Sequence, residues 1–103
     1  MKTIVVVPCY NESKRLRQED FLHYVEQNED VAFLFANDGS RDNTLEVLQT
    51  LTAKHNNLLL FDIQPNGGKA EAVRKGMLYA AEHYDPQYIA FWDADLATPL
   101  DEI

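Results

Sequence analysis

Short apolar runs alternate with longer amphipathic segments along the whole chain. Four of the runs predict strands, because they are rich in β-branched or aromatic residues and end at turn-forming residues. They cover residues 3–7, 31–36, 58–63 and 88–92. The first and last runs show no apolar–polar alternation, so we expect both to be buried on two faces, as strands of a parallel sheet are.

Between these runs, apolar residues recur at the spacing of amphipathic helices, which predicts a helix after each of the first three strands. Asp20 is the expected cap of the first helix, and Asp42 or Asn43 that of the second, which closes at residues 56–57. The third helix spans residues 70–82. The apolar faces are formed, in chain order, by Phe21, Leu22 and Val25, by Leu45, Leu48 and Leu51, and by Val73, Met77, Ala80 and Ala81.

The predicted order is β-α-β-α-β-α-β, in units of about 30 residues, the length of a right-handed parallel crossover. This order predicts an α/β fold, with one open, doubly wound, mostly parallel, Rossmann-like sheet and helices on both faces. By analogy with other mononucleotide-binding halves, the expected strand order is 3-2-1-4. The winding then reverses between the first and last strands, and ligands of such sheets bind at the carboxyl ends of the strands beside that reversal.

Acidic side chains follow three of the predicted strands at this carboxyl edge. Glu12 follows the first strand, Asp38 the second, and Asp93 and Asp95 the last. In extended backbone, Asp93 and Asp95 point to the same side and lie roughly 6–7 Å apart. Two like charges so close repel each other unless a cation lies between them, which suggests a divalent ion. The alternative is that both are solvated turn residues.

Nine basic and 17 acidic residues give the 103-residue chain a net charge of −8. This balance argues against nucleic-acid binding, which needs a basic face. The length predicts a single domain over residues 1–103. Cys9 is the only cysteine, so no disulfide forms within the chain, as expected in a reducing compartment such as the cytoplasm. The apolar run at residues 3–7 is too short for a signal peptide or a membrane span.

Familiar phosphate-binding loops are missing from the sequence. The first strand is not followed by Gly-x-Gly-x-x-Gly, so an NAD or FAD fingerprint is not supported. Ala70 follows Gly68-Lys69 where a Walker A motif needs Ser or Thr. A carboxylate-rich crevice binds a diphosphate only if a divalent cation bridges the two, because their charges repel. We therefore expect a nucleotide that bears a diphosphate, held with Mg²⁺ or Mn²⁺.

Four motifs stand in order along the chain: Val-Pro-Cys-Tyr-Asn-Glu at 7–12, Asn-Asp-Gly-Ser-Arg-Asp-Asn-Thr at 37–44, Asn-Gly-Gly-Lys at 66–69 with Ala-Val-Arg-Lys-Gly-Met at 72–77, and Phe-Trp-Asp-Ala-Asp-Leu-Ala-Thr-Pro at 91–99. They resemble the motifs of the family 2 glycosyltransferases, which are inverting enzymes with the nucleotide-diphospho-sugar (GT-A) fold. The last two are most similar to the branch that glycosylates dolichyl or polyprenyl phosphate, which makes such a phosphate an expected acceptor. The chain departs from the family pattern at Asn37, where a second Asp is frequent, and at Ala70-Glu71, where the polyprenyl branch has a glycine-rich pair.

The resemblance implies binding roles for five residues of the first three motifs. Pro8, Tyr10 and Glu12 would line the nucleotide pocket, with Tyr10 packing against the base. Asp38 would accept a hydrogen bond from the base, and Lys69 would approach the nucleotide from the third turn.

The fourth motif would supply the metal ligands. Asp95 would ligate the metal, and Asp93 would contact the ribose or the metal. Plainer alternatives exist for the residues of the earlier motifs. Tyr10 fits an aromatic side chain at the rim of a turn, Asp38 fits an Asx-turn at a strand end, and Lys69 fits a solvent-exposed residue in the first turn of a helix.

An inverting transfer needs a base to deprotonate the acceptor unless the acceptor is already ionised. In the family this residue lies well downstream of the Asp-x-Asp motif. We therefore expect the base downstream of Ile103, and we assign no catalytic residue within residues 1–103.

We expect the chain to be the donor-binding half of a cytoplasmic transferase, located at the membrane face in a full-length protein. It would bind a UDP- or GDP-sugar weakly and turn over little. The apolar edge left open by the missing half predicts a homo-oligomer.

Two other functions fit parts of the pattern. A haloacid-dehalogenase-type phosphotransferase also places Asp-x-Asp after a buried strand, but there the motif ends the first strand and Thr follows two places after the second Asp. Here the motif ends the fourth strand and Thr98 is three places on. A non-catalytic nucleotide-binding or assembly module fits the short length.

Overall fold

The computed structural model describes residues 2–11 and 16–92. Within these ranges strands and helices alternate without exception: β1 (Thr3–Cys9), α1 (Gln18–Gln27), β2 (Val31–Asp38), α2 (Thr44–Thr52), β3 (Leu58–Ile63), α3 (Lys69–Tyr84) and β4 (Tyr88–Phe91). The strands form one parallel sheet in the order β3-β2-β1-β4. The predicted α/β fold and the predicted strand order are therefore confirmed.

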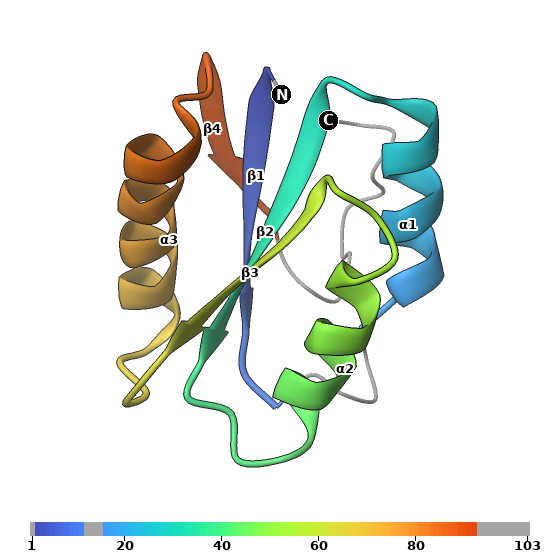
Figure 1. Cartoon of the computed structure of the whole chain (residues 1–103). Helices are drawn as coiled ribbons and strands as arrows, with labels where there is room; N and C mark the ends of the chain where they lie inside the picture. Colours follow the sequence, from blue (N-terminus) through green and yellow to red (C-terminus); the bar gives the residue numbers. More distant parts are fainter. Residues whose placement is uncertain (1, 12–15, 93–103) are drawn as a thin grey trace.

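The sheet lies between two helical layers, with α3 on one face and α1 and α2 on the other (Figure 1). β1 contributes side chains to the hydrophobic core on both faces of the sheet, because successive side chains of a strand point to opposite faces. Val5 and Val7 pack on the side of α1 and α2, whereas Ile4 and Val6 pack on the side of α3, and all four are fully buried. The prediction that the first strand is buried on both faces is confirmed.

An aromatic cluster fixes α1 on the sheet. The ring of Phe21 on α1 meets the rings of Phe33 and Phe35 on β2 edge to face, with centroids 4.9 and 5.1 Å apart. Edge-to-face pairs of this kind add about 0.5–1.5 kcal/mol to the burial of the rings. Phe21 therefore sets where α1 lies across β2.

α3 approaches the sheet through its smallest side chains. Ala72, Gly76 and Ala80 are its buried residues, whereas Val73 and Met77 are half-buried and Ala81 is exposed. Of the predicted apolar face, Ala80 is confirmed as buried, whereas the other two buried residues lie one position before the predicted Val73 and Met77. The reason is steric: a Cβ on Gly76 would lie 2.6 Å from Cγ1 of Val6, so only a glycine allows this close approach.

β1 continues through Pro8 to Cys9, although the sequence predicted that it would end at residue 7. Val6 accepts a hydrogen bond from the backbone of Trp92, so alternate residues of β1, including Pro8, direct their backbone groups toward β4. The described pairing of β4 stops at Val6 opposite Phe91. The missing N–H of Pro8 is therefore on the β4 side, and the pairing with β2 continues to Cys9.

β4 is not buried on two faces, so that part of the prediction was wrong. Tyr88 is 62% exposed and Phe91 is 52% exposed. β4 lies at the edge of the four-stranded sheet and pairs with β1 alone among the described strands. Apolar composition alone cannot distinguish such an edge strand from a central one.

Two predicted helix ends also differ from the structure. α1 begins at Gln18, so Asp20 lies inside its first turn and pairs with Arg17 at 2.9 Å instead of capping the helix. α2 ends at Thr52 and not at residues 56–57. Asn43 occupies the N-cap position without a side-chain cap hydrogen bond, and Asp42 instead accepts the N–H of Thr44 at 2.9 Å.

Candidate functional site

Three turns lie at the carboxyl edge of the sheet: residues 10–11 after β1, residues 39–43 after β2 and residues 64–68 after β3. Hydrogen bonds join the second turn to the first, and Asp38, the last residue of β2, to the third. The glycine at position 39 permits one of these approaches, because a Cβ there would lie 2.6 Å from the backbone N of Asn66, and its φ is +59°. The turns therefore form one connected surface.

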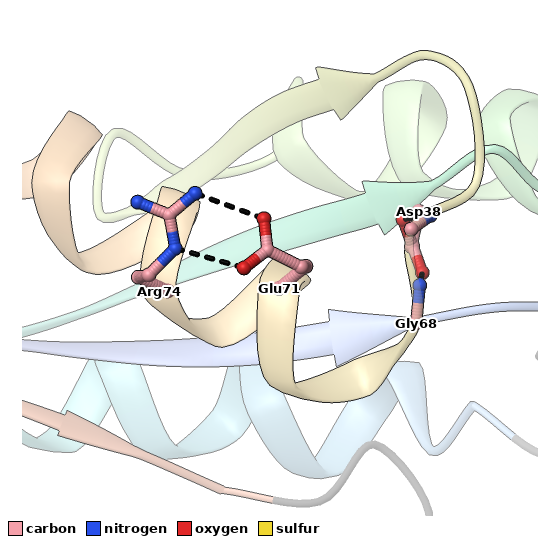
Figure 2. Close-up of polar contacts among 5 residues, drawn as sticks. Asp38, Gly68, Glu71 and Arg74 are labelled. Carbon is pink, nitrogen blue, oxygen red and sulfur yellow. Dashed lines mark hydrogen bonds and ion pairs between the residues drawn. The ribbon is translucent and has the colours of Figure 1, made fainter.

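The carboxylate of Asp38, at the end of β2, holds the turn that precedes α3. Its Oδ1 accepts the backbone N–H of Gly67 at 3.0 Å, and its Oδ2 accepts that of Gly68 at 2.9 Å. Nδ2 of Asn66 donates to the Oδ2 at 2.9 Å and to the Asp38 carbonyl at 2.8 Å. Figure 2 shows Asp38 beside Gly68, where α3 begins. Asp38 is only 3% exposed. Its carboxylate bonds residues 66–68, far away in the sequence, instead of forming the local Asx-turn that was its alternative role.

A second set of polar contacts centres on Asn37. Its Nδ2 donates to Oδ1 of Asp62 on β3 at 3.0 Å, and its Oδ1 accepts a hydrogen bond from Oγ of Ser40 at 2.5 Å. Asn37 is 1% exposed, and a buried polar group is costly unless both its donor and its acceptor are used. Both ends of this amide are satisfied.

Asn11 connects the turn after β1 to the turn after β2. Its Oδ1 accepts the backbone N–H of Arg41 at 2.9 Å and that of Asp42 at 3.4 Å. Its own backbone N–H donates to Oγ of Ser40 at 3.1 Å. The residue has a φ of +52°, in the left-handed region that asparagine tolerates better than most residues.

The structure brings four of the predicted site residues to this edge. Pro8 is half-buried near the end of β1, Tyr10 follows the strand and is 41% exposed, Asp38 ends β2, and Lys69 is the first residue of α3 and exposed. Their binding roles stay predictions. The other three, Glu12, Asp93 and Asp95, lie outside the described residues, although β4, which ends two residues before Asp93 in the sequence, runs parallel to β1 toward the same edge.

The predicted position of the catalytic base is not tested by the described residues. The base is expected downstream of Ile103, and Ile103 itself lies outside residues 2–11 and 16–92. The position of the base therefore stays a prediction, as do the donor-binding roles of the other site residues.

The metal prediction depends on residues beyond those described. Within residues 2–11 and 16–92, no group of three His, Cys, Asp or Glu side chains could hold a metal ion. The carboxylates of Asp38 and Asp62 accept hydrogen bonds from N–H groups of the protein. Asp93 and Asp95 therefore remain the proposed ligands, and their hard oxygen atoms suit Mg²⁺ or Mn²⁺.

An ion pair lies on the first two turns of α3, next to the site (Figure 2). Nε and Nη2 of Arg74 donate to the two carboxylate oxygens of Glu71 at 2.9 and 2.8 Å. The hydrogen bonds from Arg74 lower the pKa of Glu71, and Glu71 in turn raises the pKa of Arg74. Both side chains are about half exposed, so solvent screening leaves the pair little weight in stability.

Four residues that join the turns, Asn11, Ser40, Asp62 and Asn66, were not predicted to make these contacts. Each was visible in the sequence as a turn or strand-end residue. The partners could not be found from sequence, because the bonds link positions 25 to 31 residues apart. Gly68 has a φ of +95°, a backbone conformation that glycine adopts without strain.

A parallel sheet whose winding reverses beside its first strand, with connected turns at the carboxyl edge there, is typical of mononucleotide-binding α/β proteins. The comparison with protein families narrows this class. The family model for glycosyl transferase family 2 matches residues 4–103, and the chain belongs to this family.

Relatives with assigned activities agree with the family. The chain is 38% identical over 108 residues to the dolichyl-phosphate beta-glucosyltransferase ALG5C of Trichomonas vaginalis. That alignment covers 97% of this chain and 31% of the relative. It is 36% identical over 98 residues to the poly-beta-1,6-N-acetyl-D-glucosamine synthase of Staphylococcus aureus, covering 93% of this chain and 22% of that protein. The chain thus spans less than a third of the length of these relatives.

Solved structures show the same fold. S. aureus TarS (residues 1–349) superimposes with a TM-score of 0.67 at 24% identity, over 92% of this chain and 28% of that one. The complex of the same TarS fragment with UDP gives a TM-score of 0.65. In the part of the chain that the structure describes, none of the helices has the length and apolar character needed to span a membrane.

Proposed function

We propose that this chain binds the donor of a glycosyltransferase that moves a sugar, with inversion, from a nucleotide-diphospho-sugar to an acceptor. The observation that carries the proposal is the connected edge: the turns after β1 and β2 are hydrogen-bonded to each other, and Asp38, the last residue of β2, holds the turn after β3. They contain parts of the first three of the four motifs that resemble family 2 glycosyltransferases. The TarS complex with UDP supports a uridine nucleotide as the first ligand to test.

In this proposal Tyr10 packs against the base, with Pro8 and Glu12 lining the pocket. Asp38 binds the base through an acceptor position that the turn does not use. A carboxylate offers about four such positions, and three N–H donors occupy Asp38 in the structure. Lys69 is placed at the start of α3, where its charge and the helix N-terminus both favour a phosphate.

Asp93 and Asp95 would hold Mg²⁺ or Mn²⁺. When bound, the metal neutralises the charge on the departing nucleoside diphosphate. The acceptor we propose is a polyprenyl phosphate, because the names of the dolichyl-phosphate glucosyltransferase relatives state this class. We infer that the base lies downstream of Ile103, that the chain alone turns over little, and that the protein works at the cytoplasmic face of a membrane.

The test is calorimetric titration of the chain with UDP-glucose and with GDP-mannose in the presence of Mn²⁺. We expect one of them to bind, and Asp95→Ala to abolish that binding. Asp30→Ala is the matched control, because Asp30 is exposed and lies at the opposite edge, just before β2. If neither sugar nucleotide binds the unmodified chain, the proposal fails, and if Asp95→Ala binds normally, the metal role fails.

Membership of glycosyl transferase family 2 favours the transferase over the phosphotransferase and the assembly module. We also infer that copies of the chain associate through β4. The support is the exposed pair Tyr88 and Phe91 on a strand at the edge of the described sheet.

A further inference from the structure

The left-handed conformation of Asn11 brings its side chain onto the backbone of a different turn. A non-glycine residue at φ +52° is uncommon and is retained where the surrounding contacts determine it. Here the contacts are with residues 29 to 31 positions away: the N–H groups of Arg41 and Asp42 point at one side-chain oxygen, and Ser40 accepts the backbone N–H of Asn11.

This contact is the first link of a longer chain of hydrogen bonds. Ser40, which accepts from Asn11, donates to Asn37, and Asn37 donates to Asp62 on β3. Networks of this kind hold their members in one arrangement more firmly than separate bonds do. The turn after β1 is therefore tied through two intermediate residues to the third strand of the sheet.

Tyr10 lies directly before Asn11 and is 41% exposed. Because the surrounding protein holds its ring only in part, the position of the ring depends on the backbone, which the hydrogen bonds of Asn11 fix. We propose that Asn11 is a positioning residue, which holds the turn after β1 against the turn after β2 so that Tyr10 and Asp38 face the nucleotide at a fixed spacing. This inference rests on the proposed function. Preorganisation of this kind raises affinity because less ordering remains to be done when the ligand binds.

Two substitutions separate the side-chain acceptor from the backbone conformation. Asn11→Gly keeps a residue that adopts positive φ without strain but removes the oxygen that binds Arg41 and Asp42. Asn11→Asp keeps an oxygen in the same place and tolerates the same backbone region. Asn56→Gly is the matched control, since Asn56 lies in the turn before β3 at the opposite end of the sheet.

The experiment is calorimetric titration of the full chain and its variants with UDP and Mn²⁺. We expect Asn11→Gly to weaken UDP binding about tenfold, which equals about 1.4 kcal/mol, with Asn11→Asp and Asn56→Gly within about threefold of the unmodified chain. Because Asp adds a charge near a diphosphate, each titration is repeated with uridine, which has no phosphate. Thermal unfolding of Asn11→Gly should stay close to that of Asn56→Gly.

Amide hydrogen exchange gives a second readout that does not need a ligand. The amides of Arg41 and Asp42 should exchange faster in Asn11→Gly and recover their protection in Asn11→Asp. If UDP binds the unmodified chain and Asn11→Gly equally, the inference is wrong while the proposed function stands. If the unmodified chain binds none of UDP, UDP-glucose and GDP-mannose, both are wrong.

Discussion

The polar residues that are buried within the described chain, Asn37, Asp38 and Thr44, all lie at or just beyond the carboxyl end of β2. Each finds partners there: Asn37 bonds Asp62 and Ser40, Asp38 bonds the turn before α3, and Thr44 bonds Asp42. Leaving such a group unpaired costs about 1–3 kcal/mol. These side chains therefore stabilise the turns at the carboxyl edge of the sheet, whether or not they also bind a ligand.

Asn37 also accounts for one departure from the family pattern, in which Asp is frequent at this position. The amide of Asn37 donates to the carboxylate of Asp62 at 3.0 Å, and a second carboxylate could not donate. Two ionised carboxylates at this distance would repel each other, next to the already buried charge of Asp38. In this chain the amide is thus the matching partner of Asp62.

We predict that Asn37→Asp lowers the free energy of unfolding at pH 7 by about 1–3 kcal/mol, because one hydrogen bond is lost and a like-charge pair forms. In the variant, the carboxylates at positions 37 and 62 can share a proton, which binds more tightly in the folded state than in the unfolded chain. The loss in free energy of unfolding should therefore become smaller as the pH falls from 7 toward 4. Urea unfolding at several pH values measures both effects.

The reciprocal exchange is the control. In the double variant Asn37→Asp/Asp62→Asn the carboxylate and the amide change places, and we expect most of the lost stability to return. A double-mutant cycle isolates this coupling from the separate effects of each change. Equal stability of the single and double variants would contradict the pairing.

At the scale of elements, α3 approaches the sheet closely because glycine and alanine form its inner face. The missing side chain of Gly76 is filled by Val6 of β1 and Ala36 of β2, which are 2.6 and 3.5 Å from where its Cβ would be. In a helix interior, alanine is ordinarily favoured over glycine by about 1 kcal/mol. The packing here opposes that preference.

We predict that Gly76→Ala lowers the free energy of unfolding by about 1–3 kcal/mol, since an added methyl group in a closely packed interface forces neighbouring atoms apart. Thermal or urea unfolding measures the change. Val6→Ala removes the atom that would clash, so Gly76→Ala should cost less in that background. If Gly76→Ala instead stabilises the chain, α3 does not pack as closely as the structure shows.

Apolar periodicity was sufficient to predict the order of elements, because runs such as residues 3–7 and 31–36 had no competing interpretation, whereas the strand order was predicted by analogy with other mononucleotide-binding halves. It was insufficient for α3, where the inner face is Ala72, Gly76 and Ala80, residues too small to dominate a hydrophobic pattern. The edge position of β4 and the bonds of Asp38 to residues 66–68 depend on the assembled sheet. Local sequence does not contain that information.

At the scale of the whole molecule, the described chain has helices on both faces of its sheet and an apolar strand at one edge. Tyr88 and Phe91 expose most of their surface there, and an edge strand with apolar side chains pairs readily with another chain. The net charge of −8 acts in the opposite direction, because like-charged copies repel. Salt screens that repulsion.

We predict weak self-association that rises with protein concentration and with salt, measured by analytical ultracentrifugation. Phe91→Lys should keep the chain monomeric at concentrations where the unmodified chain associates, since it places a charge on the edge. Leu78→Lys is the matched control: Leu78 is 51% exposed, but it lies on α3, two residues from each of the buried Gly76 and Ala80. A chain that stays monomeric at high concentration and high salt would contradict the inference.

Trp92 is the single tryptophan of the chain, it packs against the core on the side of α1 and α2, and it immediately precedes Asp93. Its emission spectrum therefore originates from one place, the start of the Asp-x-Asp motif. Titrations with manganese or with nucleotides can be followed by intrinsic fluorescence at this one indole, without any dye or label attached to the protein.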